Sequence, residues 1–317
     1  MKVVSFYRFL DLEDPQTFRG ELQTLCDEHD LLGTILVATE GFNGTIAGRE
    51  EAIQAVLSWL QDRFDIAEDL DARWTDAEEA PFRRMRVKVK KEIVTLGRPD
   101  ILPHRNTGTH VPPERWNELI EDPNVLVIDT RNHYEFEVGT FPGAIDPGND
   151  RFREFPAFAK TLAETSPKRP LAMFCTGGIR CEKATALMLE LGFDDVYHLQ
   201  GGILNYLEKI PADQNRWDGE CFVFDTRVAI DRDLAEGGYV QCHACRRPLS
   251  SEDLESPEYR EGVSCPRCVN ETDADRRTRL EERRRQILLA RKRGEAHIGP
   301  KTQPGSLHRA VEKTKKA

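Results

Sequence analysis

The sequence predicts a chain of several domains that combines the α/β and α+β fold classes. Residues 1–98 carry patterns in the order strand, helix, strand, strand, helix, strand, whereas residues 122–215 alternate buried strands with helices. Residues 216–272 include two close pairs of cysteines, and residues 273–317 suggest a basic helix and a polar, flexible tail. With 317 residues, the chain is long enough for two or three domains of ordinary size.

The first domain is predicted from hydrophobic periodicity and from helix start signals. Asp14 and Pro15 are suited to the start of a helix, and Gly41-Phe42-Asn43-Gly44 is expected to form a turn. The order of elements predicts a ferredoxin-like or acylphosphatase-like βαββαβ domain. The expected elements are a strand at Val3–Phe9, a helix over 15–29, strands at Thr34–Ala38 and Thr45–Ala47, a helix at Glu50–Phe64 and a strand at Met85–Val94.

The central region is predicted to be an α/β unit with a parallel sheet. Short apolar runs at Val125–Asp129, Leu171–Cys175 and Val196–Leu199 are typical of strands that are buried on both faces. The segment Cys181–Leu191 has an amphipathic pattern and is followed by Gly192, a residue suited to end a helix. Residues 99–121 are expected to be a linker and the entry to this domain, since the stretch 103–113 is rich in Pro, Gly, His and Thr.

Composition restricts the possible functions. No run approaches the roughly 20 apolar residues that span a bilayer, and the N-terminus lacks the pattern of a signal peptide, so a cytoplasmic location without a membrane partner is expected. In that compartment, eight cysteines indicate metal or redox chemistry rather than disulfides. The net charge is −10, yet residues 241–317 hold 18 Lys and Arg against 12 Asp and Glu. An acidic body with a basic tail is compatible with a polyanion that is bound locally.

One loop has the features of a reactive-thiol site. A predicted strand leads into Cys175, and Gly177 and Gly178 allow the backbone to curl so that its N–H groups point toward the sulfur. A helix is expected to start near Cys181, and a helix N-terminus stabilises a thiolate, as does a fixed charge such as Arg180. We therefore expect Cys175 to be a nucleophile or persulfide carrier. The active-site loop also includes Thr176 and Ile179.

The pattern Cys-x4-Arg resembles the active-site loop of rhodanese domains, and the Cys-x5-Arg loop of tyrosine phosphatases is one residue longer. The segments Gly139–Ala144 and Leu199–Gly202 resemble other rhodanese motifs. The residues Asp129, Arg131 and Glu135 resemble the rhodanese pattern Asp-x-Arg…Glu. We expect them to support the Cys175 loop, and a direct part in the chemistry is the alternative. Cys181 could be a resolving thiol or an ordinary cysteine that packs against the sheet.

The whole chain resembles the bacterial tRNA uridine hydroxylases, which form a rhodanese-containing family. The resemblance rests on the segments Ala38–Thr45, Pro81-Phe82, Asp129–Asn132 and Cys175–Lys183. It implies an oxidoreductase that hydroxylates carbon 5 of the wobble uridine, uridine 34, in the tRNA anticodon. It also implies molecular oxygen as co-substrate and a persulfide on Cys175. The sequence shows no nicotinamide or flavin motif, and no set of two histidines and one carboxylate for iron is evident.

Two further features fit this resemblance. The cysteines Cys242, Cys245, Cys265 and Cys268 form two Cys-x2-Cys pairs, which predict a structural Zn²⁺ ribbon; iron, free thiols and a redox pair are alternatives. Basic clusters are candidate RNA contacts, although a solvated charged face is the simpler explanation for such a run. These candidates are Arg83, Arg84, Arg86, Lys88, Lys90, Arg283, Arg284 and Arg285.

Two other functions are compatible with these motifs. A rhodanese-type sulfurtransferase would use the same Cys175 loop, whereas a non-catalytic RNA-binding zinc scaffold would use only the basic and metal-binding segments. The intact Cys-x4-Arg loop argues against the scaffold. The N-terminal domain and the basic segments argue against a sulfurtransferase that acts only on small molecules.

Overall fold

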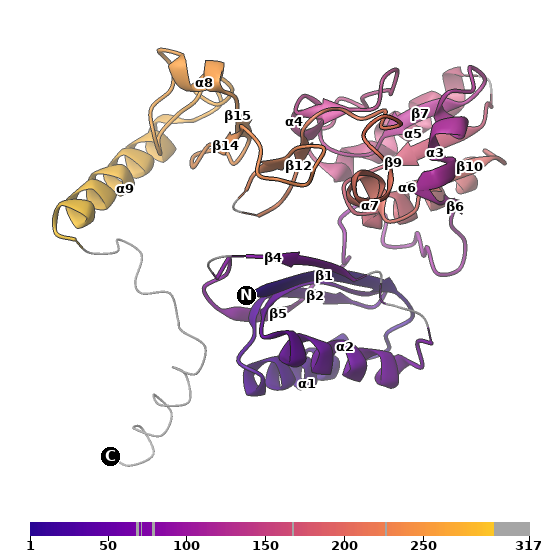
Figure 1. The fold of residues 1–317 in the computed structure, drawn as a ribbon, viewed down its shortest axis with the longest axis horizontal. Coiled ribbons are helices and arrows are strands. Elements are labelled where there is room, and N and C mark those ends of the chain that lie inside the picture. Colours follow the sequence, from indigo (N-terminus) through magenta and orange to yellow (C-terminus); the bar gives the residue numbers. More distant parts are fainter. Residues whose placement is uncertain (68–69, 71, 78–79, 167, 226, 295–317) are drawn as a thin grey trace.

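A computed structural model describes residues 1–294, except for 68–69, 71, 78–79, 167 and 226 (Figure 1). The tail that is expected to be flexible lies outside the described residues from 295 onward. In the described part, an N-terminal domain faces a central α/β domain, and smaller C-terminal elements follow (Figure 1). No helix among the described residues is long and apolar enough to cross a membrane.

The N-terminal domain contains a five-stranded sheet in the order β4-β1-β3-β2-β5. Two helices, α1 and α2, cover one face of this sheet (Figure 1). Helix α1 begins where expected because the Asp14 carboxylate accepts hydrogen bonds from the backbone N–H groups of Gln16 and Thr17, each at 3.1 Å. The elements are β1 Lys2–Phe9, α1 Pro15–Glu28, β2 Leu32–Ala38, β3 Gly41–Gly48, α2 Glu50–Phe64, β4 Arg73–Asp76 and β5 Met85–Val89.

Two details of the predicted layout are wrong. The closing strand of the βαββαβ order is Arg73–Asp76, which pairs antiparallel with β1, whereas Met85–Val89 adds a fifth strand parallel to β2 and ends before Val94. Strand β4 escaped prediction because it is a short, mostly exposed edge strand. The predicted turn at Gly41–Gly44 is part of β3, and the chain reverses at Thr39 and Glu40 instead.

The two faces of the N-terminal sheet differ in character. Side chains from alternate positions, such as Val4, Ile35 and Phe42, are fully buried under α1 and α2. The intervening positions present polar groups on the other face, which is turned toward the central domain (Figure 1). The domain therefore has one apolar core and one polar sheet surface that is available to a ligand.

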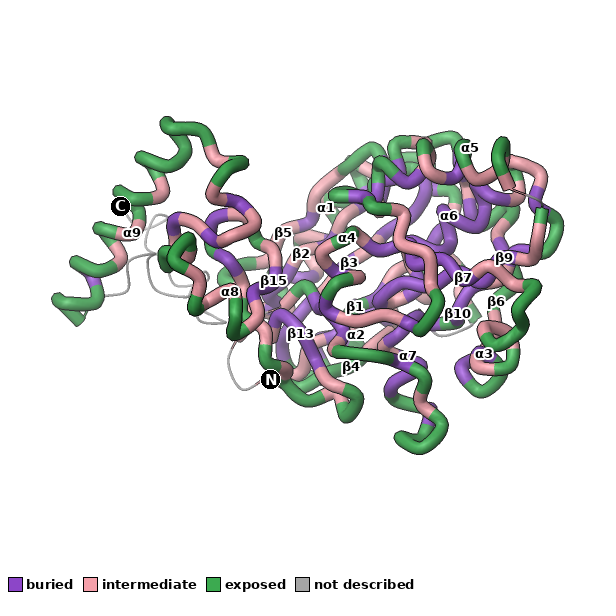
Figure 2. Tube along the Cα trace, turned by 90° about the horizontal axis from the view of Figure 1, so that it is seen from above, coloured by how far each residue is buried: buried purple, intermediate pink, exposed green. Residues whose placement is uncertain are grey.

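The central domain is built around a parallel four-stranded sheet in the order β6-β10-β9-β7. Helices α5 and α6 contact one face through Leu171 and Met173, and α3 and α7 contact the other through Ala172 and Phe174. Buried residues therefore fill both faces (Figure 2). The elements are β6 Thr109–Val111, α3 Pro113–Ile120, β7 Leu126–Asp129, α4 His133–Phe136, β8 Gly139–Thr140, η1 Phe152–Glu154, α5 Phe155–Thr165, β9 Leu171–Phe174, α6 Ile179–Glu190, β10 Val196–Leu199 and α7 Gly202–Lys209.

Part of the stretch expected to be a linker belongs to the central domain. Thr109–Val111 pairs with β10 and forms the edge of the parallel sheet. Upstream of it, Leu96 and Ile101 are buried in the core of the same domain. The high content of Pro, Gly and Thr hid this strand because it is short and its first two residues are exposed.

The C-terminal segment consists of small hairpins and two helices. The strand pairs β12–β13 and β14–β15 are antiparallel, and the second pair lies beside the cysteine cluster. Helix α9 extends away from the two larger domains, with most of its residues exposed (Figures 1 and 2). The elements are β11 Asp218–Gly219, β12 Cys221–Phe222, β13 Ala229–Ile230, β14 Val240–Gln241, β15 Pro248–Leu249, α8 Ser251–Glu255 and α9 Ala274–Lys292.

A buried ion-pair network joins the first two domains. Lys183 of α6 has a fully buried side chain, and its Nζ lies 2.8 Å from Glu40 Oε2 and 2.6 Å from Glu92 Oε2. Glu40 also accepts a hydrogen bond from the backbone N–H of Ile93, and Glu92 accepts two from the backbone that follows it. Because a buried charge is costly without its partner, this network fixes the N-terminal sheet relative to α6.

We predict that Lys183→Met destabilises the protein by about 3–5 kcal/mol, because it leaves two buried carboxylates without their cation. Urea denaturation followed by circular dichroism measures the change. Glu208→Gln is the matched control, since it removes an exposed ion pair with Arg73 between the same domains and should cost less than about 1 kcal/mol. Equal, small losses in both variants would contradict the stabilising role of the buried network.

Candidate active site

The Cys175 loop connects β9 to α6 in the central domain. Helix α6 begins at Ile179, two residues earlier than expected, after Gly178 with φ of +96°. The first turn of α7 closes the loop from the other side, where Ile203 N–H donates to the Cys175 carbonyl. A Cβ atom at Gly202 would lie 2.5 Å from the Cys175 carbonyl oxygen, so only glycine allows this approach.

The Cys175 sulfur is held as a thiolate by its surroundings. The backbone N–H of Gly178 donates to Cys175 Sγ at 3.1 Å. Full burial opposes ionisation, but a hydrogen bond from the Cys181 thiol, the Arg180 charge and the backbone N–H groups of both residues outweigh burial and lower the pKa of Cys175 to about 6. The loop therefore favours the nucleophilic form of the sulfur at neutral pH.

Cys181 lies beside the thiolate as a protonated partner. Burial and the negative charge of Cys175 raise the pKa of the Cys181 thiol well above its ordinary value. Thr130 Oγ1 lies 3.5 Å from Cys181 Sγ, and the Thr130 hydroxyl donates to the Phe174 carbonyl at 3.0 Å. The protonated Cys181 can therefore donate a hydrogen bond to the Cys175 thiolate, and its position is also compatible with the role of a resolving thiol.

Arg180 is fixed by a buried carboxylate. Its two terminal nitrogens donate to Glu135 at 2.7 and 2.9 Å, and one of them also donates to Thr176 Oγ1 at 3.2 Å. Although burial disfavours the cation, Glu135 raises the pKa of Arg180. The bidentate pair locks the guanidinium beside the loop, so that its charge acts on Cys175 from a constant position.

Asp129 and Arg131 form a second buried pair behind the loop. Arg131 donates to both carboxylate oxygens of Asp129, with a shortest distance of 2.6 Å, and also to the Gly139 carbonyl. The Arg131 guanidinium lies 5.1 Å from the centroid of the Trp217 ring. Both side chains are almost completely buried, so this pair supports the architecture and does not face a substrate.

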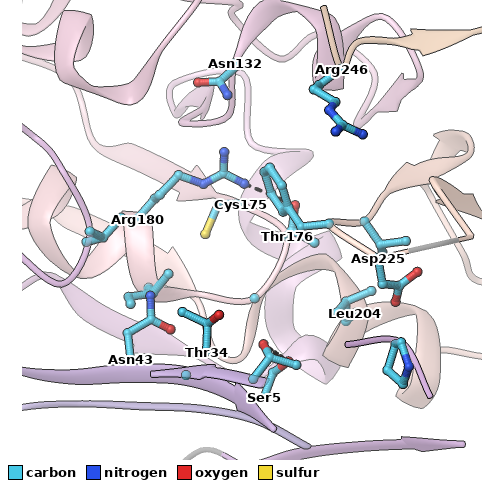
Figure 3. A pocket seen from close by; sticks show the side chains of 18 of the residues that line it. Ser5, Thr34, Asn43, Asn132, Cys175, Thr176, Arg180, Leu204, Asp225 and Arg246 are labelled. Atoms are coloured by element: carbon cyan, nitrogen blue, oxygen red, sulfur yellow. Dashed lines mark hydrogen bonds between the residues drawn. The ribbon is translucent and has the colours of Figure 1, made fainter. Parts of the chain in front are cut away.

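The Cys175 loop forms one wall of a cleft of about 1510 Å³ between the domains. Thr176, Gly177 and Ile179 also line the cleft. The opposite wall is the polar face of the N-terminal sheet, as Figure 3 shows for Ser5, Thr34 and Asn43. A third wall comes from Val223, Phe224, Asp225 and Arg227 and from the cysteine-rich segment. The cleft is large enough to admit a nucleotide, and Cys175 is part of its lining.

The charge around the cleft differs from that of the whole chain. Among the residues that the structure describes, eight arginines line it against five carboxylates, although the chain carries a net charge of −10. A positive cleft in an acidic protein favours an anionic substrate. The arginines are Arg73, Arg151, Arg153, Arg180, Arg227, Arg246, Arg247 and Arg276.

The predicted RNA contacts lie around the cleft rather than in it. Arg86 and Lys88 pair with the cleft-lining residues Thr34 and Leu36 across β2 and β5, so they extend the same sheet face outward. Arg83, Arg84 and Lys90 are exposed beside them. The candidates Arg283, Arg284 and Arg285 lie on α9, away from the cleft, and Arg285 forms an ion pair with Glu282. The cleft arginines escaped prediction because they are scattered through the sequence.

The four C-terminal cysteines converge on one point. Their sulfur atoms all lie within 4.8 Å of one another, with 3.8 Å between Cys245 and Cys265 and 3.5 Å between Cys265 and Cys268. Four thiolates at about 2.3 Å from a tetrahedral metal are about 3.8 Å apart, so the arrangement fits a metal ion. Arg246 and Arg276 extend from this cluster to the cleft, and Arg276 donates to the Ala244 carbonyl.

The structure also assembles a set of two histidines and one carboxylate, which no sequence motif predicts. Ligand atoms of His110, Glu182 and His198 all lie within 4.8 Å of one another. His110 Nε2 lies 2.8 Å from Glu182 Oε1, while His198 is buried and neither of its ring nitrogens has a hydrogen-bond partner within the described chain. The set was missed because β6 was not predicted. Tyr7 connects it with the cleft through its hydroxyl, 3.4 Å from Glu182.

Comparison with known proteins identifies the family. Residues 1–93 match the UPF0176 acylphosphatase like domain, and residues 112–209 match the Rhodanese-like domain. Over 297 residues, or 94% of this chain, the sequence is 50% identical to the tRNA uridine(34) hydroxylase of Rhizobium leguminosarum bv. trifolii, of which it covers 96%. The chain belongs to the tRNA uridine(34) hydroxylase family. Family members from Agrobacterium fabrum and Teredinibacter turnerae are 50% and 48% identical, again over 94% of this chain.

Two segments that carry the resemblance to the family meet at the interdomain network. Glu40 lies in the segment Ala38–Thr45, and Lys183 ends the segment Cys175–Lys183, both of which carry that resemblance. The structure joins these distant segments through the ion pair of Lys183 with Glu40. Sequence reasoning missed this role because nothing in either segment indicates that the two are in contact.

We predict that Cys181→Ala raises the pKa of Cys175 from about 6 toward 9.0, because the alanine cannot donate a hydrogen bond to the thiolate. Cys181→Ser, which keeps a donor, should leave the pKa near that of the unmodified protein. The pH dependence of iodoacetamide alkylation, followed by mass spectrometry of the peptide that contains Cys175, measures both values. If the alanine and serine variants share one midpoint, Cys181 is not the donor.

Proposed function

We propose that this chain hydroxylates carbon 5 of uridine 34, the wobble uridine of tRNA, to 5-hydroxyuridine, with molecular oxygen as co-substrate. The observation that carries the proposal is a stabilised Cys175 thiolate at the wall of a positive, nucleotide-sized cleft. The names of the relatives supply the reaction and the substrate. Binding of the anticodon region would use the cleft arginines and the basic sheet edge, since phosphate recognition depends on such charges. A cytoplasmic location agrees with this substrate and remains a prediction.

The reaction requires two electrons in addition to oxygen. One oxygen atom enters the C5–H bond and gives a hydroxyl group, and the other oxygen atom is reduced to water. The Cys175 thiolate and the neighbouring Cys181 thiol can supply both electrons by forming a disulfide, with one proton of the water from Cys181 and the other from solvent. An external thiol would then reduce the disulfide. We also expect Cys175 to carry a persulfide, which would appear as one additional sulfur atom on its peptide.

We further propose that Cys242, Cys245, Cys265 and Cys268 bind a structural Zn²⁺. The sulfur geometry supports a tetrahedral site, and four thiolate ligands leave no open position for catalysis. The surrounding segment has few other buried apolar residues, so metal binding would supply much of its folding energy. The metal would thereby hold Arg246 and Arg276 at the cleft.

The function is tested by analysing tRNA from a strain that lacks this protein. We expect mass spectrometry of the digested tRNA to show a loss of 5-hydroxyuridine and its derivatives, provided that parallel pathways are deleted as well. Expression of the intact protein should restore them, whereas Cys175→Ala should not, although it should still fold and bind tRNA. Unchanged 5-hydroxyuridine would contradict the proposal, and a selective loss of thiolated nucleosides would support a sulfurtransferase instead.

Metal analysis tests the zinc site separately. We expect about one Zn²⁺ per chain in the purified protein, and a loss of that ion in Cys242→Ser because a structural site needs all four ligands. Cys26→Ser is the matched control, since Cys26 is buried in the N-terminal core and away from the cluster. Metal content that is the same in both variants would show that the four cysteines are not the ligands.

A further inference from the structure

Phe224 is an exposed aromatic residue at the wall of the cleft. It is 68% exposed, more than any other large hydrophobic residue that the structure describes as exposed, and it lies in the loop between β12 and β13. Its ring and the Cys175 loop line the same cleft. An exposed aromatic ring beside a reactive group offers an apolar face on which a flat ligand can stack.

The Phe224 ring is held in position by its neighbours. The buried Phe222 ring contacts it edge to face, with 5.0 Å between centroids and an angle of 88°, and Tyr134 contacts Phe222 in the same manner. The Arg180 guanidinium lies 5.8 Å from the Phe224 centroid. Because so much of the ring is exposed, it still has surface on which a flat ligand can stack.

Asn43 faces this region from the N-terminal sheet. It lies on β3 at a position that points into the cleft, opposite Cys175 (Figure 3). Its Nδ2 donates to the Ile93 carbonyl at 3.1 Å. This bond fixes the orientation of the amide, because a flipped amide would place Asn43 Oδ1 against the Ile93 carbonyl oxygen. The Asn43 side chain therefore presents its carbonyl oxygen, a hydrogen-bond acceptor, to a ligand.

We propose that Phe224 and Asn43 form a uracil-binding site, in which the base stacks on Phe224 and donates its N3–H to Asn43 Oδ1. This inference rests on the proposed function and deepens it. N3 and C6 occupy opposite corners of a pyrimidine ring. A uracil whose N3–H is bonded to the sheet therefore turns its C5–C6 edge toward the opposite wall, where Cys175 lies. The site thus orients the carbon that is hydroxylated.

The same contact discriminates between the two RNA pyrimidines. Uracil carries a hydrogen on N3, whereas N3 of cytosine is an acceptor and would oppose the Asn43 oxygen. Sites that hydrogen-bond one substrate reject an analogue that leaves the group unpaired. Stacking on Phe224 contributes affinity without this selectivity, because every base has a π face.

Binding of anticodon stem-loop RNAs with uridine or cytidine at position 34 tests the role of Asn43. We expect the unmodified protein to bind the uridine form about tenfold more tightly, and Asn43→Ala to reduce this ratio to about one. Thr45→Ala is the matched control, since Thr45 lies two residues along the same strand face and its hydroxyl already contacts Ser5. An Asn43→Ala variant that keeps the full preference for uridine would overturn the proposal.

Substitutions of Phe224 test the stacking contact. We expect Phe224→Ala to weaken binding of both RNAs by about tenfold or more, while Phe224→Trp retains affinity and its added fluorescence is quenched by the bound base. Loss of binding in the tryptophan variant as well, or no loss in the alanine variant, would contradict stacking.

Failure of the proposed function has a different signature. It would appear as an unmodified protein that neither prefers nor hydroxylates the uridine RNA. If hydroxylation occurs while the Asn43 and Phe224 variants behave normally, only this inference is wrong.

Discussion

The negative charge on Cys175 is the feature on which the proposed chemistry depends. An isolated charge is expensive inside a protein, and the Cys175 side chain is fully buried. The cost is offset by directed donors, namely the Gly178 N–H, the Cys181 thiol and the first-turn amides of α6, together with the charge of Arg180. Glu135 holds that arginine in place with a bidentate ion pair. Glu135, Arg180 and Cys181 thus act together to stabilise an anion at the loop.

The N-terminal domain converts this loop into a binding site. A thiolate loop alone could react with small molecules, but the polar sheet face opposite it creates a cleft with two walls. The ion pairs of Lys183 with Glu40 and Glu92 hold these walls together, and the cysteine-rich segment contributes arginines at the third side. The rhodanese-like domain therefore supplies a reactive sulfur, and the N-terminal domain supplies a polar surface. The cysteine-rich segment adds positive charge.

Local sequence signals predicted the parts of the structure that are local in origin. The Cys175 loop, the paired cysteines and the buried parallel strands each depend on a few adjacent residues, and all were visible in the sequence. Strands β4 and β6 were missed because they are short edge strands whose existence depends on tertiary pairing. The contact of Glu40 with Lys183 and the set of His110, Glu182 and His198 bring together residues far apart in the chain, which no local pattern can reveal. The cleft itself has no sequence signature for the same reason.

The central claim is tested most directly by titrating Cys175 in the intact protein. The ultraviolet absorbance of the thiolate can be recorded against pH for the unmodified protein and for Cys175→Ser, and the difference isolates this sulfur from the other cysteines. The structure predicts a single step in the difference with its midpoint near pH 6. A midpoint at or above about 8.5, the value of an ordinary cysteine, would show that the loop does not stabilise a thiolate and would contradict the account.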